Sequence, residues 1–124
     1  MSMTETICAI STAPGIGGIA VARVSGPDAL SIVKKLWGGK PIDTIEPRTA
    51  RLGELRDSRG EVLDKGIITI FKDPASYTGE DTVEIAVHGS RWIQQELIAS
   101  LCKAGARLAE PGEFTRRAVK SGRL

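Results

Sequence analysis

The sequence predicts an α+β domain, with a mixed, largely antiparallel sheet of about five strands and about three helices. The first observation is a set of short, β-branched runs in which apolar residues alternate, as in IAVARVS and TVEIAV. The second is the polar turn at 57–60, which joins two such runs into an antiparallel hairpin. The third is a helical pattern at 91–104 that is long enough to cross between strands. We expect the helices chiefly on one side of the sheet.

The composition is that of one ordinary globular domain, because 124 residues can bury a core without disulfides or metals. The net charge of +2 is too small for a broad nucleic-acid-binding surface, although the C-terminal end is locally basic. Cys8 and Cys102 are far apart and outside any CxxC motif, so we expect free thiols and no zinc site. The sequence shows neither a signal peptide nor a membrane helix, which indicates a cytoplasmic protein.

The first two strands are predicted at 6–10 and 19–25, on either side of the glycine-rich segment GIGGIA. This segment matches G-x-G-x-x-A, the phosphate-binding pattern of dinucleotide-binding folds, but that pattern requires a following helix. A β-branched run follows instead, so a tight connection between strands is favoured over a nucleotide site. Arg23 ends an apolar row in the second strand and must reach water, a carboxylate or a ligand.

A helix is predicted after Ser25-Gly26-Pro27, with Ser25 as its N-cap, and its apolar face continues to Trp37. Gly38-Gly39 ends this helix. Gly39-Lys40 resembles the end of a phosphate-binding P-loop, but Pro41 replaces the required hydroxyl residue. We therefore expect this chain neither to bind nor to hydrolyse GTP. The hairpin strands are predicted next, at 48–55 and 62–71.

The stretch SYTGEDTVEIAV carries the most informative alternation. Val83, Ile85 and Val87 share one face of the predicted strand, so Glu84 points to the other. A carboxylate in mid-strand is either a solvated edge residue or the floor of a binding site, and the pattern alone leaves both open. We expect the preceding acidic pair at 80–81 to stabilise the turn, and the histidine that follows at 88 to be structural.

The remaining elements are two helices and a short strand. Ser90 is a plausible N-cap for the helix RWIQQELIASLCKA, which ends at Gly105. A short strand at 106–109 and a helix that begins at Pro111-Gly112-Glu113 follow. The chain stops soon after this last helix has begun, so we expect it to be a cut fragment.

Three segments carry a family resemblance: TAPGIGGIAVARVSGPDAL, DPASYTGEDTVEIAVHG and ARLAEPGEFTRRAVKSGRL. They resemble the N-terminal domain of the MnmE/TrmE family of tRNA modification GTPases over essentially the whole chain. The resemblance implies a tetrahydrofolate-binding fold like that of the glycine-cleavage T protein, which forms a homodimer and holds formyl- or methylene-tetrahydrofolate. It assigns residues 1–118 to this folate-binding and dimerisation domain, and 119–124 to the start of a helical domain.

In this family the helical domain carries an inserted GTPase domain, which would use GTP, magnesium and potassium. The resemblance further implies that the longer protein works with the flavin protein MnmG/GidA on the wobble uridine of tRNA. For this chain we expect binding rather than catalysis, with no catalytic residue, and its residues predict no metal site and no membrane association.

The resemblance matches three folate-binding positions to Arg23, Glu84 and Arg123. Arg123 stands in SGRL where the family motif resembles NGKL, so the charge is kept while the hydrogen-bond geometry changes. Ile16 is a second departure, because many members have a basic residue between the glycines. These departures leave open a second interpretation, an assembly module with a vestigial pocket. A stand-alone dinucleotide enzyme is the third.

Overall fold

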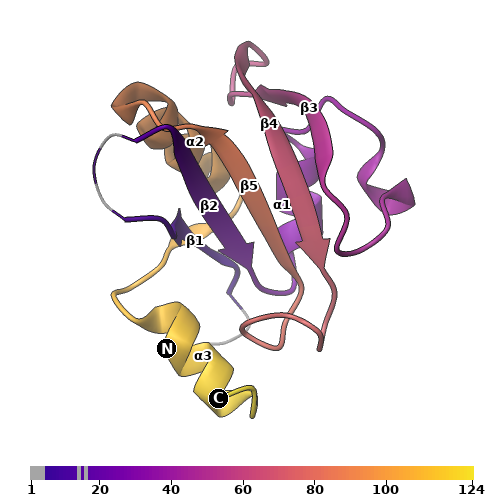
Figure 1. Cartoon of the computed structure of the whole chain (residues 1–124), viewed down its shortest axis with the longest axis vertical. Helices are drawn as coiled ribbons and strands as arrows, with labels where there is room; N and C mark the ends of the chain where they lie inside the picture. The colour runs from indigo at the N-terminus through magenta and orange to yellow at the C-terminus, as the bar shows by residue number, and fades with distance from the viewer. Residues whose placement is uncertain (1–4, 14, 16) are drawn as a thin grey trace.

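A six-stranded sheet organises the computed structural model, which describes residues 5–13, 15 and 17–124 (Figure 1). In the order β3-β4-β5-β2-β1-β6, all neighbours are antiparallel except β1 and β6, which are parallel. The strands are β1 (Ile7–Ile10), β2 (Ile19–Ser25), β3 (Arg51–Arg56), β4 (Val62–Phe71), β5 (Thr82–His88) and β6 (Arg107–Leu108). The predicted mixed, largely antiparallel α+β sheet is confirmed, and the two-residue β6 makes the sixth strand.

One face of the sheet packs against helices and forms the core. The helices α1 (Ala29–Lys34) and α2 (Arg91–Lys103) lie behind the sheet in Figure 1. Alternate β2 residues, Ala20, Ala22 and Val24, point to this side and are buried. Leu97 and Leu101 of α2 are fully buried there, and each contributes about 1.5–3 kcal/mol through removal of apolar surface from water.

The predicted ends of α2 are confirmed. Ser90 is the N-cap, and its Oγ accepts a hydrogen bond from the backbone N–H of Ile93 at 3.1 Å. After the helix, Gly105 has a φ of 126°, a left-handed conformation that a side chain would strain.

The predicted start of the first helix is wrong. Ser25 is the last residue of β2, and its hydroxyl lies 2.7 Å from Thr78 Oγ1 and donates to Glu80 Oε1 at 3.1 Å. The N-cap position of α1 is Asp28, which caps through no side-chain hydrogen bond. The helix is also shorter than predicted, because Trp37 leaves it to form an isolated bridge with Leu55 of β3. A short 3₁₀ helix, η1 (Ile42–Thr44), lies between α1 and β3.

Two connections between strands agree with the sequence. In the β3–β4 hairpin, Asp57 Oδ1 accepts from the backbone N–H groups of Arg59 and Glu61, and Gly60 has a φ of 84°. The glycine-rich segment joins the antiparallel strands β1 and β2, so the prediction that a strand and not a helix follows the glycines is confirmed. The departure at Ile16 lies outside the described residues. This segment packs so closely that a Cβ at Gly89 would collide with the Gly17 carbonyl.

Cys8 and Cys102 are free thiols whose Sγ atoms lie 3.8 Å apart, between β1 and α2. Burial raises the pKa of the Cys8 thiol to about 12, and the nearby Cys102 adds to this shift. None of the helices that the structure describes is long and apolar enough to cross a membrane. Within the described ranges, no three His, Cys, Asp or Glu side chains are grouped to hold a metal ion.

Candidate functional site

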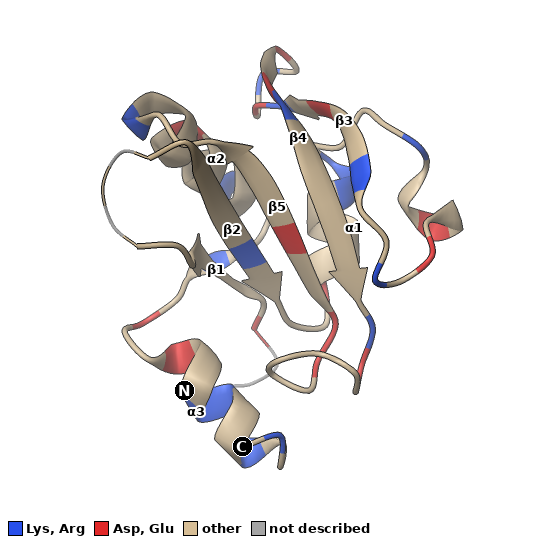
Figure 2. Ribbon diagram, viewed as in Figure 1, with Lys and Arg blue, Asp and Glu red and all other residues tan. Residues whose placement is uncertain are grey.

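Arg23 and Glu84 meet on the face of the sheet that α1 and α2 leave uncovered. They are direct partners in the β2–β5 ladder, and Figure 2 shows the basic segment of β2 beside the acidic segment of β5. Arg23 donates from Nε and Nη2 to Glu84 Oε2, at 3.2 and 3.0 Å. The structure therefore brings together two of the three residues that the resemblance indicated.

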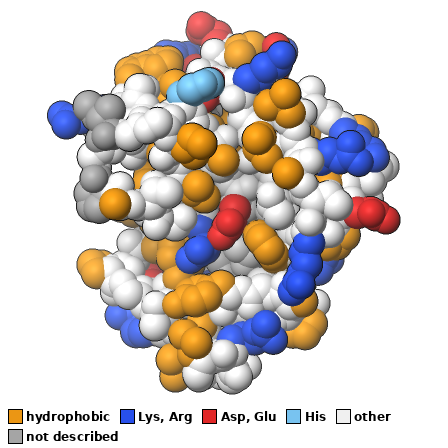
Figure 3. All heavy atoms as spheres, viewed as in Figure 1, with side chains coloured by type: hydrophobic (Ala, Val, Ile, Leu, Met, Phe, Trp, Pro, Cys, Tyr) orange, Lys and Arg blue, Asp and Glu red, His pale blue; other side chains and the backbone are white. Residues whose placement is uncertain are grey.

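The uncovered face around this pair is largely apolar. Ile19, Leu52 and Ile67, from three different strands, are 68%, 64% and 41% exposed. Figure 3 shows hydrophobic side chains gathered on this face, with one acidic and one basic group side by side near its middle. Soluble proteins rarely leave such groups of apolar side chains in water unless they bind something.

The Arg23–Glu84 pair keeps spare hydrogen-bonding capacity. Both hydrogen bonds end on Oε2, and Oε1 has no donor among the residues that the structure describes. The side chains of Arg23 and Glu84 are 21% and 32% exposed, so a ligand can reach them. An ionised carboxylate has about four acceptor sites, so Glu84 can accept two further N–H donors from a planar ligand edge.

Two aromatic rings fix the Arg23 guanidinium from its other side. Its Cζ lies 5.1 Å from the ring centroid of Tyr77 and 5.3 Å from that of Phe114. At this distance a cation is attracted to the ring face. These three side chains line a cavity of about 400 Å³, together with the segment 109–112. The guanidinium is therefore held in one orientation before any ligand arrives.

Phe114 reaches this place because α3 (Glu113–Lys120) is anchored by buried charges. Glu113 and Arg117 are almost completely buried. Arg107 Nη2 donates to Glu113 Oε2 at 2.7 Å, and Arg117 Nη1 donates to Glu80 Oε1 at 2.8 Å. The hydrogen bonds from Arg107 lower the pKa of Glu113 to about 2, although burial opposes this shift.

The end of α3 also contacts the turn that precedes β5. Ser121 Oγ donates to the Thr78 carbonyl at 2.6 Å. Gly79 has a φ of 84°, and a Cβ at this position would lie 2.5 Å from Ser121 Oγ. Only glycine allows so close a contact here. The turn, α3 and the Arg23–Glu84 pair therefore form one connected structure.

The remaining polar residues of this stretch bond to other parts of the fold. Glu80 accepts from Ser25 and Arg117, and Asp81 Oδ1 accepts from the backbone N–H of Asp73 at 2.8 Å. The His88 ring nitrogen Nδ1 lies 3.0 Å from Asp64 Oδ1, at the far end of β5 from the turn.

Arg123, the third residue indicated by the resemblance, does not contact Arg23 or Glu84. Its Nε donates to the Ser76 carbonyl at 3.1 Å, and its side chain lines a separate cavity of about 290 Å³. Tyr77 lines this cavity as well as the one beside Arg23, so the two cavities are neighbours.

Three residues near the site escaped the sequence interpretation: Arg48, Tyr77 and Phe114. Tyr77 carried a usable signal, because it is the only tyrosine of the chain and lies inside the motif PASYTGEDTVE. Phe114 carried the same kind of signal, because it lies inside ARLAEPGEFTRRAVKSGRL. Arg48 carried none, since it lies in the loop before β3 and outside all three segments.

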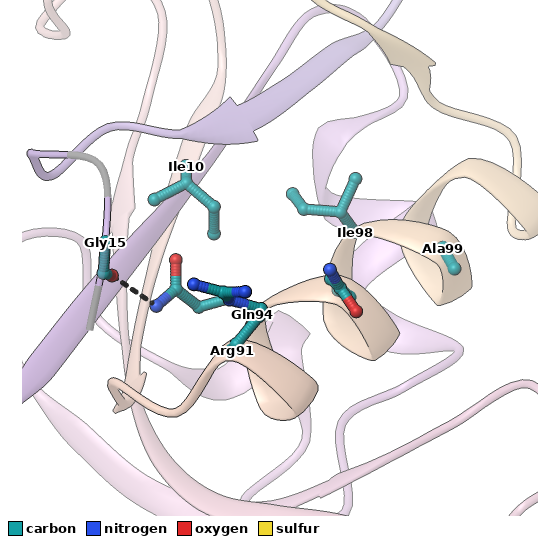
Figure 4. Close-up of a pocket in the computed structure, with 7 residues that line it drawn as sticks. Ile10, Gly15, Arg91, Gln94, Ile98 and Ala99 are labelled. Carbon is teal, nitrogen blue, oxygen red and sulfur yellow. Dashed lines mark hydrogen bonds between the residues drawn. The ribbon is translucent and has the colours of Figure 1, made fainter.

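A larger cavity, about 620 Å³, lies elsewhere, beside α2 (Figure 4). Ile10 and Ile98 give it an apolar wall, and Gln94 Nε2 donates to the carbonyls of Gly15 and Gly89 at 3.1 and 3.0 Å. Gln94 thus holds the backbone together there, and Arg91 and Gln95 also line the cavity. Its size alone does not make it the better candidate.

Comparisons with known proteins find a family match over almost the whole chain. Residues 6–123 match the family model described as the GTP-binding protein TrmE N-terminus. Similar proteins described as tRNA modification GTPase MnmE come from Parabacteroides distasonis, Porphyromonas gingivalis and Fervidobacterium nodosum, at 48%, 52% and 47% identity. Each alignment covers 97% of this chain but only 26–27% of the relative, so the chain spans about a quarter of their length.

Proposed function

This chain belongs to the TrmE N-terminal family, and from that membership we propose that it binds a one-carbon tetrahydrofolate and forms a homodimer. The ligand is formyl- or methylene-tetrahydrofolate. The chain acts as the N-terminal part of a GTPase that modifies the wobble uridine of tRNA together with MnmG/GidA, in the cytoplasm. GTP, magnesium and potassium are then used by a different domain of that protein.

The observation that carries the folate proposal is the free oxygen of Glu84. A pterin presents adjacent N–H donors along its 2-aminopyrimidinone edge, and a carboxylate accepts two of them as a pair. Glu84 Oε1 has no donor within the described part of the chain, and Arg23 holds Oε2 in place. These two residues fit the pterin edge: Glu84 accepts its N–H groups, and Arg23 holds Glu84 in orientation.

Calorimetric titration of the chain with 5-formyltetrahydrofolate tests this proposal. The wild-type chain should bind, and Glu84→Gln should weaken binding by roughly 2–4 kcal/mol, because the amide turns one acceptor into a donor that faces another donor. Glu61→Gln is the matched control, since Glu61 lies in the β3–β4 turn with a side chain that is 74% exposed. Equal folate affinities for wild type, Glu84→Gln and Glu61→Gln would show that Glu84 does not contact the ligand.

A second candidate function, an assembly module without a working pocket, is favoured by the exposed apolar side chains of the sheet. Ile19, Leu52 and Ile67 lie on the face that carries Arg23 and Glu84, uncovered by either α1 or α2. A two-fold dimer brings the same surface of both copies together, so a single apolar patch suffices for both. We assign the dimer to this face, and folate binding distinguishes the two functions.

Sedimentation of variants tests the dimer. Leu52→Glu should shift the chain toward monomer, because it places a charge within the apolar face. Trp92→Glu is the control, since Trp92 is 57% exposed but belongs to α2 on the opposite side of the sheet. A wild-type chain that stays monomeric well above micromolar concentration would contradict dimerisation by this chain.

A further inference from the structure

The cavity of about 290 Å³ beside the Arg23–Glu84 pair is lined by two arginines, Arg48 and Arg123. Phe71 and Tyr77 supply aromatic surface to the same cavity. Arg48 and Arg123 are far apart in the sequence, so their convergence is a property of the fold alone.

Neither arginine has a carboxylate partner within the described ranges. Arg48 Nη2 lies 3.5 Å from the Ala75 carbonyl, and Arg123 Nε donates to the Ser76 carbonyl at 3.1 Å. By contrast, Arg23 and Arg117 both pair with glutamates. Carbonyl contacts position a guanidinium without neutralising it, so this cavity concentrates uncompensated positive charge.

Arg48 is also held in an unusual backbone conformation. Its φ is 65°, and no other non-glycine residue that the structure describes has a positive φ. Its backbone N–H donates to the Ile70 carbonyl at 2.8 Å, which fixes this conformation beside β4. A non-glycine residue in the left-handed region is strained, and such residues are concentrated at ligand-binding sites.

The cavity lies at the right place to continue the proposed folate site. Glu84 is opposite Thr69 in the β4–β5 ladder, and Phe71 follows Thr69 on the same face, about 7 Å further along the strand. Tyr77 contacts the Arg23 guanidinium on one side and lines this cavity on the other. A ligand whose ring binds at Glu84 can therefore extend along β4 toward Arg48.

We propose that Arg48 and Arg123 together bind the carboxylates of the folate's glutamyl tail, an inference that rests on the proposed folate-binding function. Arg48 is then the residue that makes the site favour a ligand with a glutamyl tail over one without it. Guanidinium groups suit this role because they bind carboxylates in pairs of parallel hydrogen bonds.

The test compares ligands that share the pterin ring and differ in the tail: 5-formyltetrahydropteroate, which lacks glutamate, 5-formyltetrahydrofolate and its triglutamate. In the wild-type chain, affinity should rise about 10-fold from the pteroate to the folate, as expected for a charge-assisted contact, and should not fall with the triglutamate. In Arg48→Asn the rise should drop below about 3-fold while the pteroate binds as before. Asparagine tolerates the left-handed backbone, so this variant removes the charge and retains the turn.

Two further variants make the result specific. Arg51→Asn removes one positive charge from β3, outside the cavity, and should keep the full preference for the tail. Arg48→Lys keeps the charge without the planar fork and should retain part of the preference. Thermal melts followed by circular dichroism establish that each variant is folded.

Three outcomes would overturn the inference. If Arg48→Asn keeps the 10-fold rise, Arg48 does not contact the tail, although the folate site at Glu84 stands. If Arg48→Asn loses binding to a short RNA hairpin while its preference for the tail is unchanged, the cavity binds phosphates. If the wild-type chain binds neither the pteroate nor the folate, the proposed function fails, and the tail site fails with it.

Discussion

Two groupings in this molecule are built from the same residue types, arginine and glutamate, but differ in burial. Under α3, Glu113 is fully buried and both its oxygens accept hydrogen bonds from Arg107, with a further bond from Arg117. On the open face of the sheet, Arg23 and Glu84 are partly exposed, and one Glu84 oxygen has no donor among the described residues. The saturated grouping fixes a helix in place, whereas the unsaturated one is available to a ligand.

The largest expected effect is the loss of stability when the saturated grouping is broken. Glu113→Gln leaves Arg107 and Arg117 without their buried carboxylate, and removal of one partner from such a grouping typically costs about 3–5 kcal/mol. Urea unfolding measures this change. Glu110→Gln is the control, because Glu110 pairs with Arg116 at the surface and should cost less than about 1 kcal/mol. Equal losses would contradict the distinction drawn here.

Acid should unfold the chain through the same carboxylate. The pKa of Glu113 falls from 4.5 to about 2, chiefly because Arg107 donates hydrogen bonds to it. Folding therefore favours the ionised form, so this stabilisation is complete above pH 4.5 and is lost as the pH falls toward 2. Melting temperatures of wild type and Glu113→Gln should differ most near neutral pH and converge in acid. A difference that is constant with pH would assign the loss to packing instead.

Substitution of Arg23 should weaken ligand binding, by less than Glu113→Gln weakens the fold. Arg23→Ala removes the group that orients Glu84 and should cost about 1.5–3 kcal/mol of folate affinity, the scale of a hydrogen bond to a charged group. Arg23→Lys should be nearly as damaging, because lysine lacks the planar fork that bonds through Nε and Nη2. Titration calorimetry measures both. A lysine variant with full affinity would mean that only the charge matters.

The smallest expected effect is on stability, at Glu84, and it separates the exposed pair from the buried one. Glu84→Gln should change the free energy of unfolding by less than about 0.5 kcal/mol, because its pair with Arg23 is partly exposed and such pairs contribute little. The same urea titration used for Glu113→Gln measures it. Unfolding of the chain by Glu84→Gln would make Glu84 a structural residue, and the pocket would then lie elsewhere.

The local patterns of the sequence predicted most of the fold. Alternation in β5 placed Glu84 away from the core, and the Ser90 cap and Gly105 marked the ends of α2, because these signals depend only on neighbouring residues. The N-cap assigned to Ser25 failed for the opposite reason. Its hydroxyl bonds to Thr78 and Glu80, more than fifty positions away, and no local pattern contains that competition.

The site itself was only partly predictable. The family resemblance supplied Arg23 and Glu84, but their position opposite each other depends on strand order, which is non-local. Arg48 could not be predicted, since its left-handed backbone lies in a loop and its N–H donates to Ile70 of β4, a non-local contact. The folate role of Arg123, the domain boundary after residue 118, and the partners MnmG/GidA and tRNA stay predictions.

The hydrogen bond from Ser121 to the Thr78 carbonyl links the last helix, α3, to the turn before β5. Because the Ser121 hydroxyl binds the turn that leads into β5, the docking of α3 and the ordering of this turn are coupled. Coupling of this kind is reciprocal, so a ligand that orders the turn strengthens the docking of α3 by the same factor. Amide hydrogens at the end of α3 would then exchange more slowly with solvent when the site is occupied. Through this one serine hydroxyl, amide exchange in α3 would report ligand binding at the Arg23–Glu84 pair.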